Sequence, residues 1–462
     1  MITTTSQIVR LNPHWSEQGV PKSRNSWHRE IFSHIEEWLF NRQIIVLQGL
    51  RRVGKSTLME QLRDKFVGQK LSGRPKNYFY FSFENEDLDQ LLPISELDAL
   101  LDYYFREVLS SPPARYDEDL LIVLDEIQNV SGWQSVIKQF YDINPKIKFI
   151  VSGSAGVFLR ESSESLAGRI IEFEIPPLSF REFQDLSGIK LVDAQKDPLR
   201  SLDISPQFIS KNQIDLFETF LLCGGFPECA LGIKAGESER KQQEYIRESV
   251  VNKVILKDIR NLLGSKSPLK DLQLFKVLAF ESGNILNKKK LASDVGYAEE
   301  TVKSHIDAFK QAFLLNELEK FSTKLRHRIN SPAKSYVSSP SIGASMAEMN
   351  ELNDRKFAGY LAETYAFQRL SALKRDLTFA QNPQNKEIDF FMAKDRLAIE
   401  CKYSTSIELR EFKFLLATSR EFALKPVVFT KSSFDAKDGA ERCGKQKRSA
   451  PSALKFIPLM FI

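Results

Sequence analysis

Residues 49–57 read Gly-Leu-Arg-Arg-Val-Gly-Lys-Ser-Thr, the complete G-x-x-x-x-G-K-[ST] pattern of a phosphate-binding loop. An apolar run at residues 44–47 precedes the loop, and a helical pattern that includes Leu58 and Leu62 follows it. In this context the glycines let the backbone turn sharply, so that N–H groups and the helix N-terminus point at phosphate. The stretch predicts a nucleoside-triphosphate site. The alternative is a surface turn rich in glycine and basic residues.

Each residue of the loop is expected to contact the nucleotide: Gly49, Leu50, Arg51, Arg52, Val53, Gly54, Lys55, Ser56 and Thr57. Lys55 would reach the β and γ phosphates and take part in catalysis, and the Ser56 hydroxyl would ligate Mg²⁺. Arg51 and Arg52 either touch phosphate or hold the loop to nearby acids. The predicted cofactors are therefore ATP and Mg²⁺.

A second apolar run, residues 120–124, ends in Asp125 and Glu126. Ligands collect at the carboxyl ends of the strands in open parallel sheets. Asp125 is therefore expected to hold the Mg²⁺ shell, as a Walker B aspartate does. Glu126 is expected to orient and polarise the attacking water. The alternative is a buried strand followed by an exposed acidic turn.

Two further catalytic candidates follow along the chain. The strand-like run at residues 149–151 ends in Ser152-Gly153-Ser154. Ser154, in preference to Ser152, is expected to sense the γ-phosphate, although a plain strand-to-loop turn explains the stretch as well. Arg169, next to Gly168, could act in trans as an arginine finger on a neighbour's nucleotide. Its alternative is a structural ion pair.

The composition indicates a globular protein of several domains. A length of 462 residues corresponds to roughly three domains. No apolar run approaches the ~18 residues needed to span a bilayer, and the start is polar, so we expect no membrane association. The four cysteines have neither disulfide-framework nor zinc spacing, which is typical of a reducing cytoplasm. A net charge of +5 does not by itself predict nucleic-acid binding.

The chain changes character along its length. Residues 1–175 alternate strand-like runs with helical patterns, as a parallel α/β sheet does. After Pro176 the pattern becomes helical. A segment with Pro332 and Pro340 among several serines indicates a connector. Beyond it, a helix and further strands are expected. The strand-like runs are residues 44–47, 78–83, 120–124, 149–151, 170–175, 388–392, 397–401 and 427–430.

Several short motifs together resemble the AAA_14/DUF4143 group of AAA+-like ATPases. They are Leu-Gln-Gly-Leu-Arg-Arg-Val-Gly-Lys-Ser, Leu-Asp-Glu-Ile-Gln, Ser-Gly-Ser, Leu-Ala-Gly-Arg at 166–169, Pro-Leu-Ser-Phe-Arg-Glu-Phe at 177–183 and Gly-Gly-Phe-Pro-Glu at 224–228. The resemblance implies an α/β fold with a P-loop AAA+-like parallel sheet core (residues 1–190), a helical lid (191–265), a winged-helix-like module (266–330) and a nuclease-like domain (331–462). AAA+-like proteins often form rings, so a homo-oligomer is an open expectation.

Residues 291–306 fit a helix-turn-helix, with Gly296 in the turn. In DNA-binding versions the second helix enters the major groove, which would expose Lys303 and His305. Glu299 and Glu300 at its start would repel phosphate, so DNA contact stays open. The basic clusters at 288–290, 324–328 and 445–448 suggest nucleic acid but are equally explained as solvated surface.

The C-terminal region carries Asp389 and, on the next predicted strand, Glu400-Cys401-Lys402. This arrangement resembles the PD-(D/E)XK nuclease core and implies a C-terminal αβββαβ restriction-endonuclease-like domain. Strand alternation puts Glu400 and Lys402 on one face. Asp389 and Glu400 would share a metal ion, and Lys402 would position water or stabilise charge. Glu363 lies on a mostly apolar helical stripe, where an inward carboxylate needs a partner or a metal.

Three functions are compatible with these motifs. The first is an ATPase whose nucleotide state controls a nuclease-like effector acting on nucleic acid, most simply DNA. The second is an ATP-dependent switch or scaffold whose nuclease-like domain is inactive and binds a protein partner or DNA. The third is a motor that loads or remodels nucleic acid through the winged-helix-like module.

Overall fold

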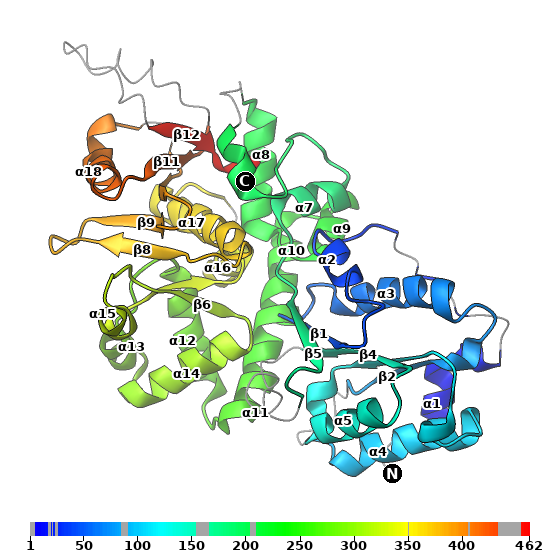
Figure 1. Cartoon of the computed structure of the whole chain (residues 1–462). Coiled ribbons are helices and arrows are strands. Elements are labelled where there is room, and N and C mark those ends of the chain that lie inside the picture. The colour runs from blue at the N-terminus through cyan, green and yellow to red at the C-terminus, as the bar shows by residue number, and fades with distance from the viewer. Residues whose placement is uncertain are drawn as a thin grey trace. The chain divides into compact units, whose positions relative to one another are not determined.

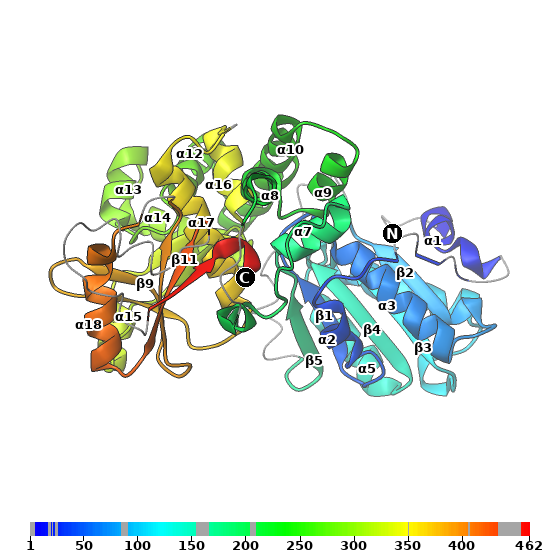
Figure 2. The ribbon, with the colours of Figure 1, turned by 90° about the horizontal axis from the view of Figure 1, so that it is seen from above.

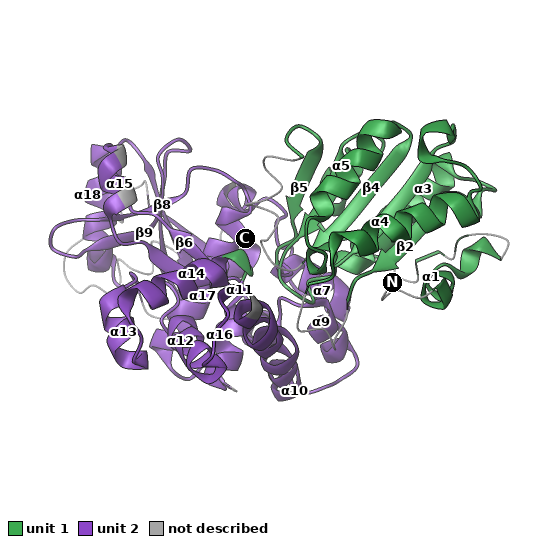
Figure 3. Ribbon diagram, turned by 90° about the horizontal axis from the view of Figure 1, so that it is seen from below, with its two compact units in different colours: residues 1–176, 311–313 green, residues 177–310, 314–462 purple. Residues whose placement is uncertain are grey.

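The computed structural model describes residues 5–16, 20, 22–23, 26–84, 91–153, 166–203, 209–349, 351–404, 407–432 and 454–462. The chain divides into two compact units (Figure 3). Unit 1 comprises residues 1–176 and 311–313, and unit 2 comprises residues 177–310 and 314–462. The finer domain boundaries expected from the sequence stay predictions.

Unit 1 is built on a five-stranded parallel sheet, as the alternating pattern predicted. The strands lie in the order β2-β3-β4-β1-β5. Their bounds are β1 Ile44–Gln48, β2 Tyr78–Ser82, β3 Leu120–Asp125, β4 Ile147–Gly153 and β5 Ile170–Glu174. Because all neighbours are parallel, the carboxyl ends of β1, β3 and β4 meet at one edge of the sheet. That edge receives the phosphate-binding loop and Asp125.

Helices cover both faces of this sheet. Alternate strand residues such as Val46, Ile122 and Val151 share a core with Leu100 of α4 and Ile137 of α5. Successive strand residues point to opposite faces, and Figures 1 and 2 show α2 and α3 across the sheet from that core. The helices of unit 1 are α1 Thr5–Leu11, α2 Phe32–Glu36, α3 Lys55–Lys70, α4 Ile94–Tyr103 and α5 Trp133–Ile143.

Unit 2 begins with helices, as expected after Pro176. The first of them starts with a capping box: Glu182 N donates to Ser179 Oγ at 3.1 Å, and Ser179 N donates to Glu182 Oε2 at 3.0 Å. A second capping box joins Ser210 and Gln213. The helices are α7 Phe180–Ser187, α8 Lys211–Cys223, α9 Pro227–Lys234, α10 Glu239–Tyr245 and α11 Arg260–Leu263.

Three helices and a two-stranded antiparallel sheet follow: α12 Pro268–Phe280, α13 Lys288–Val295, α14 Glu299–Gln311, β6 Leu315–Leu318 and β7 Lys334–Val337. The connector expected around Pro332 and Pro340 is wrong, because this segment contains β7 and the start of α16 (Pro340–Ala347). His305, expected to be a surface or packing residue, is a packing residue: it is buried, and its Nε2 lies 2.8 Å from Asp271 Oδ1, so it is not exposed as in DNA-binding versions. Lys303 is exposed.

A second five-stranded sheet, in the order β12-β11-β10-β9-β8, ends the chain. Its strands β8, β9 and β10 are antiparallel, whereas β10, β11 and β12 are parallel. Helix α18 packs on this sheet through Leu415, which shares a core with Phe391 and Val428. The remaining elements are α15 Leu325–Asn330, α17 Arg355–Ser371, β8 Thr378–Gln381, β9 Glu387–Met392, β10 Leu397–Lys402, α18 Lys413–Glu421, β11 Lys425–Thr430 and β12 Lys455–Pro458.

Within the described residues, the helices are all too short or too polar for a membrane crossing.

A buried lysine ties β4 to the segment that precedes β1. Lys148 is 4 % exposed, and its Nζ donates to the carbonyl oxygens of Trp38, Asn41 and Gln43 at 2.9, 2.8 and 2.6 Å. These three acceptors lie just before the strand that leads into the phosphate-binding loop. Lys148 therefore fixes the start of β1.

Replacing Lys148 with Met should destabilise unit 1, because three carbonyls lose their donor and a buried unsatisfied group costs about 1–3 kcal/mol. All four tryptophans, Trp15, Trp27, Trp38 and Trp133, lie in unit 1, so thermal unfolding followed by tryptophan fluorescence reports on this unit. Lys146→Met is the control, since Lys146 is a half-exposed neighbour paired with Asp117. Equal melting temperatures for the two variants would contradict the assignment.

Candidate functional site

The phosphate-binding loop requires glycine at its first position. Gly49 has φ +148°, and a Cβ there would lie 2.6 Å from the carbonyl oxygen of Ile175. The residue before Gly49 holds the two segments at this short distance, because Ile175 N donates a hydrogen bond to Gln48 O at 2.7 Å. Gly54, with φ +95°, occupies the N-cap of α3 in the left-handed region, which a residue with a Cβ rarely adopts.

Lys55 is the first residue of α3 and is buried beneath the loop. Its Nζ donates to Gly49 O at 3.0 Å and to Leu50 O at 3.1 Å. The ammonium thus lies against two carbonyl groups of the loop. The loop leads directly into the N-terminus of α3. A phosphate bound at this N-terminus would meet both the helix dipole and the lysine charge.

Ser56 and Asp125 meet directly. The Ser56 hydroxyl donates to Asp125 Oδ2 at 2.8 Å, and the Ser152 hydroxyl donates to Asp125 Oδ1. Burial raises the pKa of Asp125, the charge of Glu126 adds to this, and the hydrogen bonds from Ser152 and Ser56 oppose it. A hydroxyl and a carboxylate oxygen are hard ligands of the kind Mg²⁺ prefers. This donor set fits the expected Mg²⁺ together with substrate phosphate.

Glu126 follows in a strained conformation. Its φ is +52°, in the left-handed region, which is uncommon for a residue with a side chain and is concentrated at functional sites. Its carboxylate accepts a hydrogen bond from Gln128 Nε2 at 2.5 Å. The turn carries Glu126 away from the strand direction, while its N–H donates to Asp125 Oδ1 at 3.1 Å. The two acids therefore lie side by side at the loop edge of the sheet.

The two other predicted ATPase residues are placed differently. Ser154 lies outside the described residues, and the hydroxyl that contacts Asp125 belongs to Ser152, the serine we had passed over. Arg169 precedes β5 and forms a bidentate ion pair with Asp142 at 2.9 and 3.0 Å. It lies at the strand edge opposite the phosphate-binding loop, because Ile44 N, at the start of β1, donates to Arg169 O. A role in trans stays a prediction.

Arg29 is a residue of the loop's surroundings that sequence reasoning missed. It is buried, and its guanidinium donates to Val53 O at 2.7 Å and to Pro176 O at 2.8 Å. It therefore ties the middle of the phosphate-binding loop to the segment just after β5. No motif marks it, because its partners are backbone carbonyls 24 and 147 residues away.

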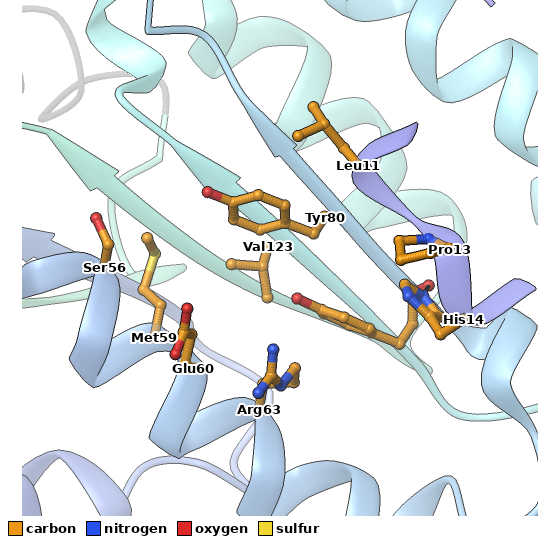
Figure 4. A pocket seen from close by; sticks show the side chains of 10 residues that line it. Leu11, Pro13, His14, Ser56, Met59, Glu60, Arg63, Tyr80 and Val123 are labelled. Atoms are coloured by element: carbon orange, nitrogen blue, oxygen red, sulfur yellow. Dashed lines mark hydrogen bonds between the residues drawn. The ribbon is translucent and has the colours of Figure 1, made fainter. Parts of the chain in front are cut away.

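A cavity of about 230 Å³ opens beside Ser56 (Figure 4). Glu60 and Arg63 extend from α3 toward Tyr80 and Val123 of the strands, and the segment with Leu11, Pro13 and His14 lies across from them. The cavity is lined by Leu11, Pro13, His14, Ser56, Met59, Glu60, Arg63, Tyr78, Tyr80 and Val123. The sequence motifs did not point to it.

The predicted nuclease-like residues lie in unit 2, around a lysine that we had not predicted. Lys334 of β7 has no exposed side-chain surface, and its Nζ lies 2.9 Å from Glu363, 3.1 Å from Asp389 and 3.2 Å from Glu387. Burial and the charge of Asp389 raise the pKa of Glu363 to about 7, against the opposing effect of Lys334. The partner of the inward Glu363 is therefore an ammonium group.

Glu400 and Lys402 both lie on β10. Lys402 Nζ lies 2.9 Å from Glu411, and its side chain is 41 % exposed. Burial and the charge of Asp389 raise the pKa of Glu400 to about 8. Among the residues that the structure describes, no three His, Cys, Asp or Glu side chains are grouped so as to hold a metal ion. The predicted set Glu363, Asp389 and Glu400 therefore does not fit a metal as arranged.

Residues 41–184 match the family model described as an AAA domain, AAA_14. Together with the phosphate-binding loop, Asp125 and the five-stranded parallel sheet, this match defines a P-loop domain of the AAA+-like class, which implies nucleotide use. Residues 214–353 match a domain of unknown function, DUF8612. Neither description names a nuclease.

Two similar chains are described as uncharacterized proteins. One from Haemophilus influenzae is 25 % identical over 302 residues, which cover 64 % of this chain and 66 % of that protein. The chain thus spans just under two thirds of that relative. The uncharacterized protein MJ1637 of Methanocaldococcus jannaschii is 24 % identical over 362 residues, covering 76 % of this chain and 73 % of that protein.

Two solved structures show partial likeness. The Aeropyrum pernix ORC1 protein in complex with DNA has 14 % identity and a TM-score of 0.32, covering 74 % of this chain and 96 % of that chain. C. elegans PCH-2 has 14 % identity and a TM-score of 0.29, covering 44 % and 59 %. Scores this low support no conclusion about function.

Replacing Arg29 with Lys should weaken ATP binding roughly 10-fold, a loss of ~1.4 kcal/mol, because an ammonium cannot replace the two-pronged guanidinium that holds Val53 and Pro176. Isothermal titration with ATP and Mg²⁺ measures the change. Arg42→Lys is the control, since Arg42 stacks on Tyr141 at 4.3 Å and donates to its carbonyl oxygen. Unchanged affinity in Arg29→Lys would show that the clamp does not shape the loop.

Proposed function

We propose that this protein is a Mg²⁺-dependent ATPase of the AAA+-like class that acts as a nucleotide-controlled switch on its C-terminal, nuclease-like domain. The observation that carries the ATPase proposal is the direct meeting of Ser56 and Asp125 at the end of the phosphate-binding loop. The family match over residues 41–184 supports the same site.

In this proposal the chain's own residues divide the work. The loop N–H groups and Lys55 bind the phosphates, and Ser56 and Asp125 hold the metal ion. Mg²⁺, when bound, neutralises charge that develops on the phosphates. Glu126, next to Asp125, orients and polarises the attacking water. Arg29 keeps the loop in position through Val53 and Pro176.

For the C-terminal domain, the geometry favours an inactive, partner-binding domain over an active nuclease. Glu363 and Asp389 share the ammonium of Lys334, and Lys402 pairs with Glu411. We therefore propose that ATP turnover controls binding of a partner by the C-terminal domain. Nucleic acid is the partner we favour, because the module that precedes this domain (residues 266–330) exposes Lys289, Lys290 and Lys303, which would add positive charge for the same ligand.

Replacing Glu126 with Gln should preserve ATP binding and slow hydrolysis by ~10²–10³, the usual cost of removing one group that stabilises the transition state. Phosphate release under single-turnover conditions measures the rate. Glu118→Gln is a matched control, because Glu118 precedes the opposite end of β3 and contacts Asn77. Turnover that stays unchanged in Glu126→Gln would show that another group activates the water.

Replacing Lys55 with Met should abolish detectable ATP binding, because the loop loses the charge that faces the β and γ phosphates. Fluorescent ATP analogues measure the affinity. Lys65→Met serves as the control, since Lys65 lies on the same helix and pairs with Glu36 at 2.8 Å. Full binding by Lys55→Met would contradict the proposed nucleotide site.

A further inference from the structure

Lys334 brings a positive charge between Glu363 and Asp389, two of the three carboxylates that were predicted to hold a metal ion. It belongs to β7, which pairs with β6, whereas the carboxylates around it come from α17 and β9. Its side chain is completely buried. A buried ammonium is costly unless paired and hydrogen-bonded, and Glu363, Asp389 and Glu387 supply that pairing within 3.2 Å.

The oxygens nearest the ammonium already accept hydrogen bonds. Glu363 Oε1 accepts from Lys334 Nζ at 2.9 Å and from the Tyr336 hydroxyl at 2.6 Å. Asp389 Oδ1 accepts from Lys334 Nζ at 3.1 Å, and its Oδ2 accepts from Cys401 N at 2.9 Å. Both oxygens of Asp389 are therefore used within the fold.

A divalent ion on the same oxygens would also be repelled. At the ~2.1 Å ligand distance of Mg²⁺, an ion on Glu363 Oε1 would lie no more than roughly 5 Å from Lys334 Nζ. Space is limited as well, since a Cβ at Gly283 would lie 3.2 Å from that same oxygen. Mg²⁺ usually keeps several waters, for which this crowded side of Glu363 leaves little room.

We infer that Lys334 is a built-in cation that takes the place of a metal ion between Glu363 and Asp389, so that the C-terminal domain of this protein binds no divalent metal there. The inference deepens the proposed inactive, partner-binding role of this domain. It also gives β7 a specific role, because the lysine on this strand joins the two-stranded β6–β7 sheet to the last sheet of unit 2.

The test uses the full chain with Asp125→Asn, so that the nucleotide site contributes no metal binding, and measures bound Mn²⁺ by electron paramagnetic resonance without nucleotide. In the chain that retains Lys334, the amount of bound Mn²⁺ should be the same with and without Glu363→Gln. Lys334→Met should gain one Mn²⁺ site, and adding Glu363→Gln should remove it again. Lys320→Met, which replaces a half-buried lysine bonded to Gln381, should gain none.

Two results would overturn the inference. One is Mn²⁺ binding by the chain that retains Lys334, if Glu363→Gln or Asp389→Asn abolishes it. The other is a folded Lys334→Met variant that gains no site. Should Lys334→Met fail to fold, the double variant Lys334→Met/Glu363→Gln should recover a cooperative melting transition, because it also neutralises one of the three carboxylates that the lost ammonium leaves unpaired. No recovery would also contradict the inference. ATP hydrolysis, measured separately on the chain with Asp125 intact, tests the ATPase proposal alone.

Discussion

The hydrogen bond between Ser56 and Asp125 is the contact on which the nucleotide site depends. It joins two segments that lie 69 residues apart, and it forms only because β1 and β3 run parallel in one sheet and end at the same edge. Lys148 fixes the start of β1, and Arg29 fixes the loop that follows it. Each of these contacts limits how far the loop can move from the acid pair at the end of β3.

The same arrangement places two features that lower the free energy of unfolding at the nucleotide site. Glu126 adopts a left-handed backbone conformation, and burial raises the pKa of Asp125. Both features oppose stability and are maintained by the surrounding sheet. Such local cost is typical of residues held ready for chemistry. In unit 2 burial also raises the pKa of Glu363 and of Glu400, but there one ammonium, that of Lys334, is shared by Glu363, Asp389 and Glu387. The difference between the two sites is therefore this internal cation, which supports binding over metal-dependent cleavage in unit 2.

The sequence predicted the parts that local pattern controls. The phosphate-binding loop, its flanking strand and helix, and the acid pair after β3 follow from spacing and apolar periodicity within a few residues. Ser152 could not be preferred over Ser154, because that choice depends on β4 lying next to β3, with Leu124 paired to Val151. Arg29 and Lys334 were missed for a similar reason. Their partners are distant in the chain, and a single basic residue carries no motif.

The central claim is that one Mg²⁺-nucleotide site is formed by the phosphate-binding loop and the end of β3. An experimental structure of the chain with Mg²⁺ and a non-hydrolysable ATP analogue tests it most directly. We expect the phosphates to lie against the loop N–H groups and Lys55, with Mg²⁺ bound by Ser56 and held through Asp125. A nucleotide bound elsewhere, or a metal ion that lies away from both Ser56 and Asp125, would contradict this site.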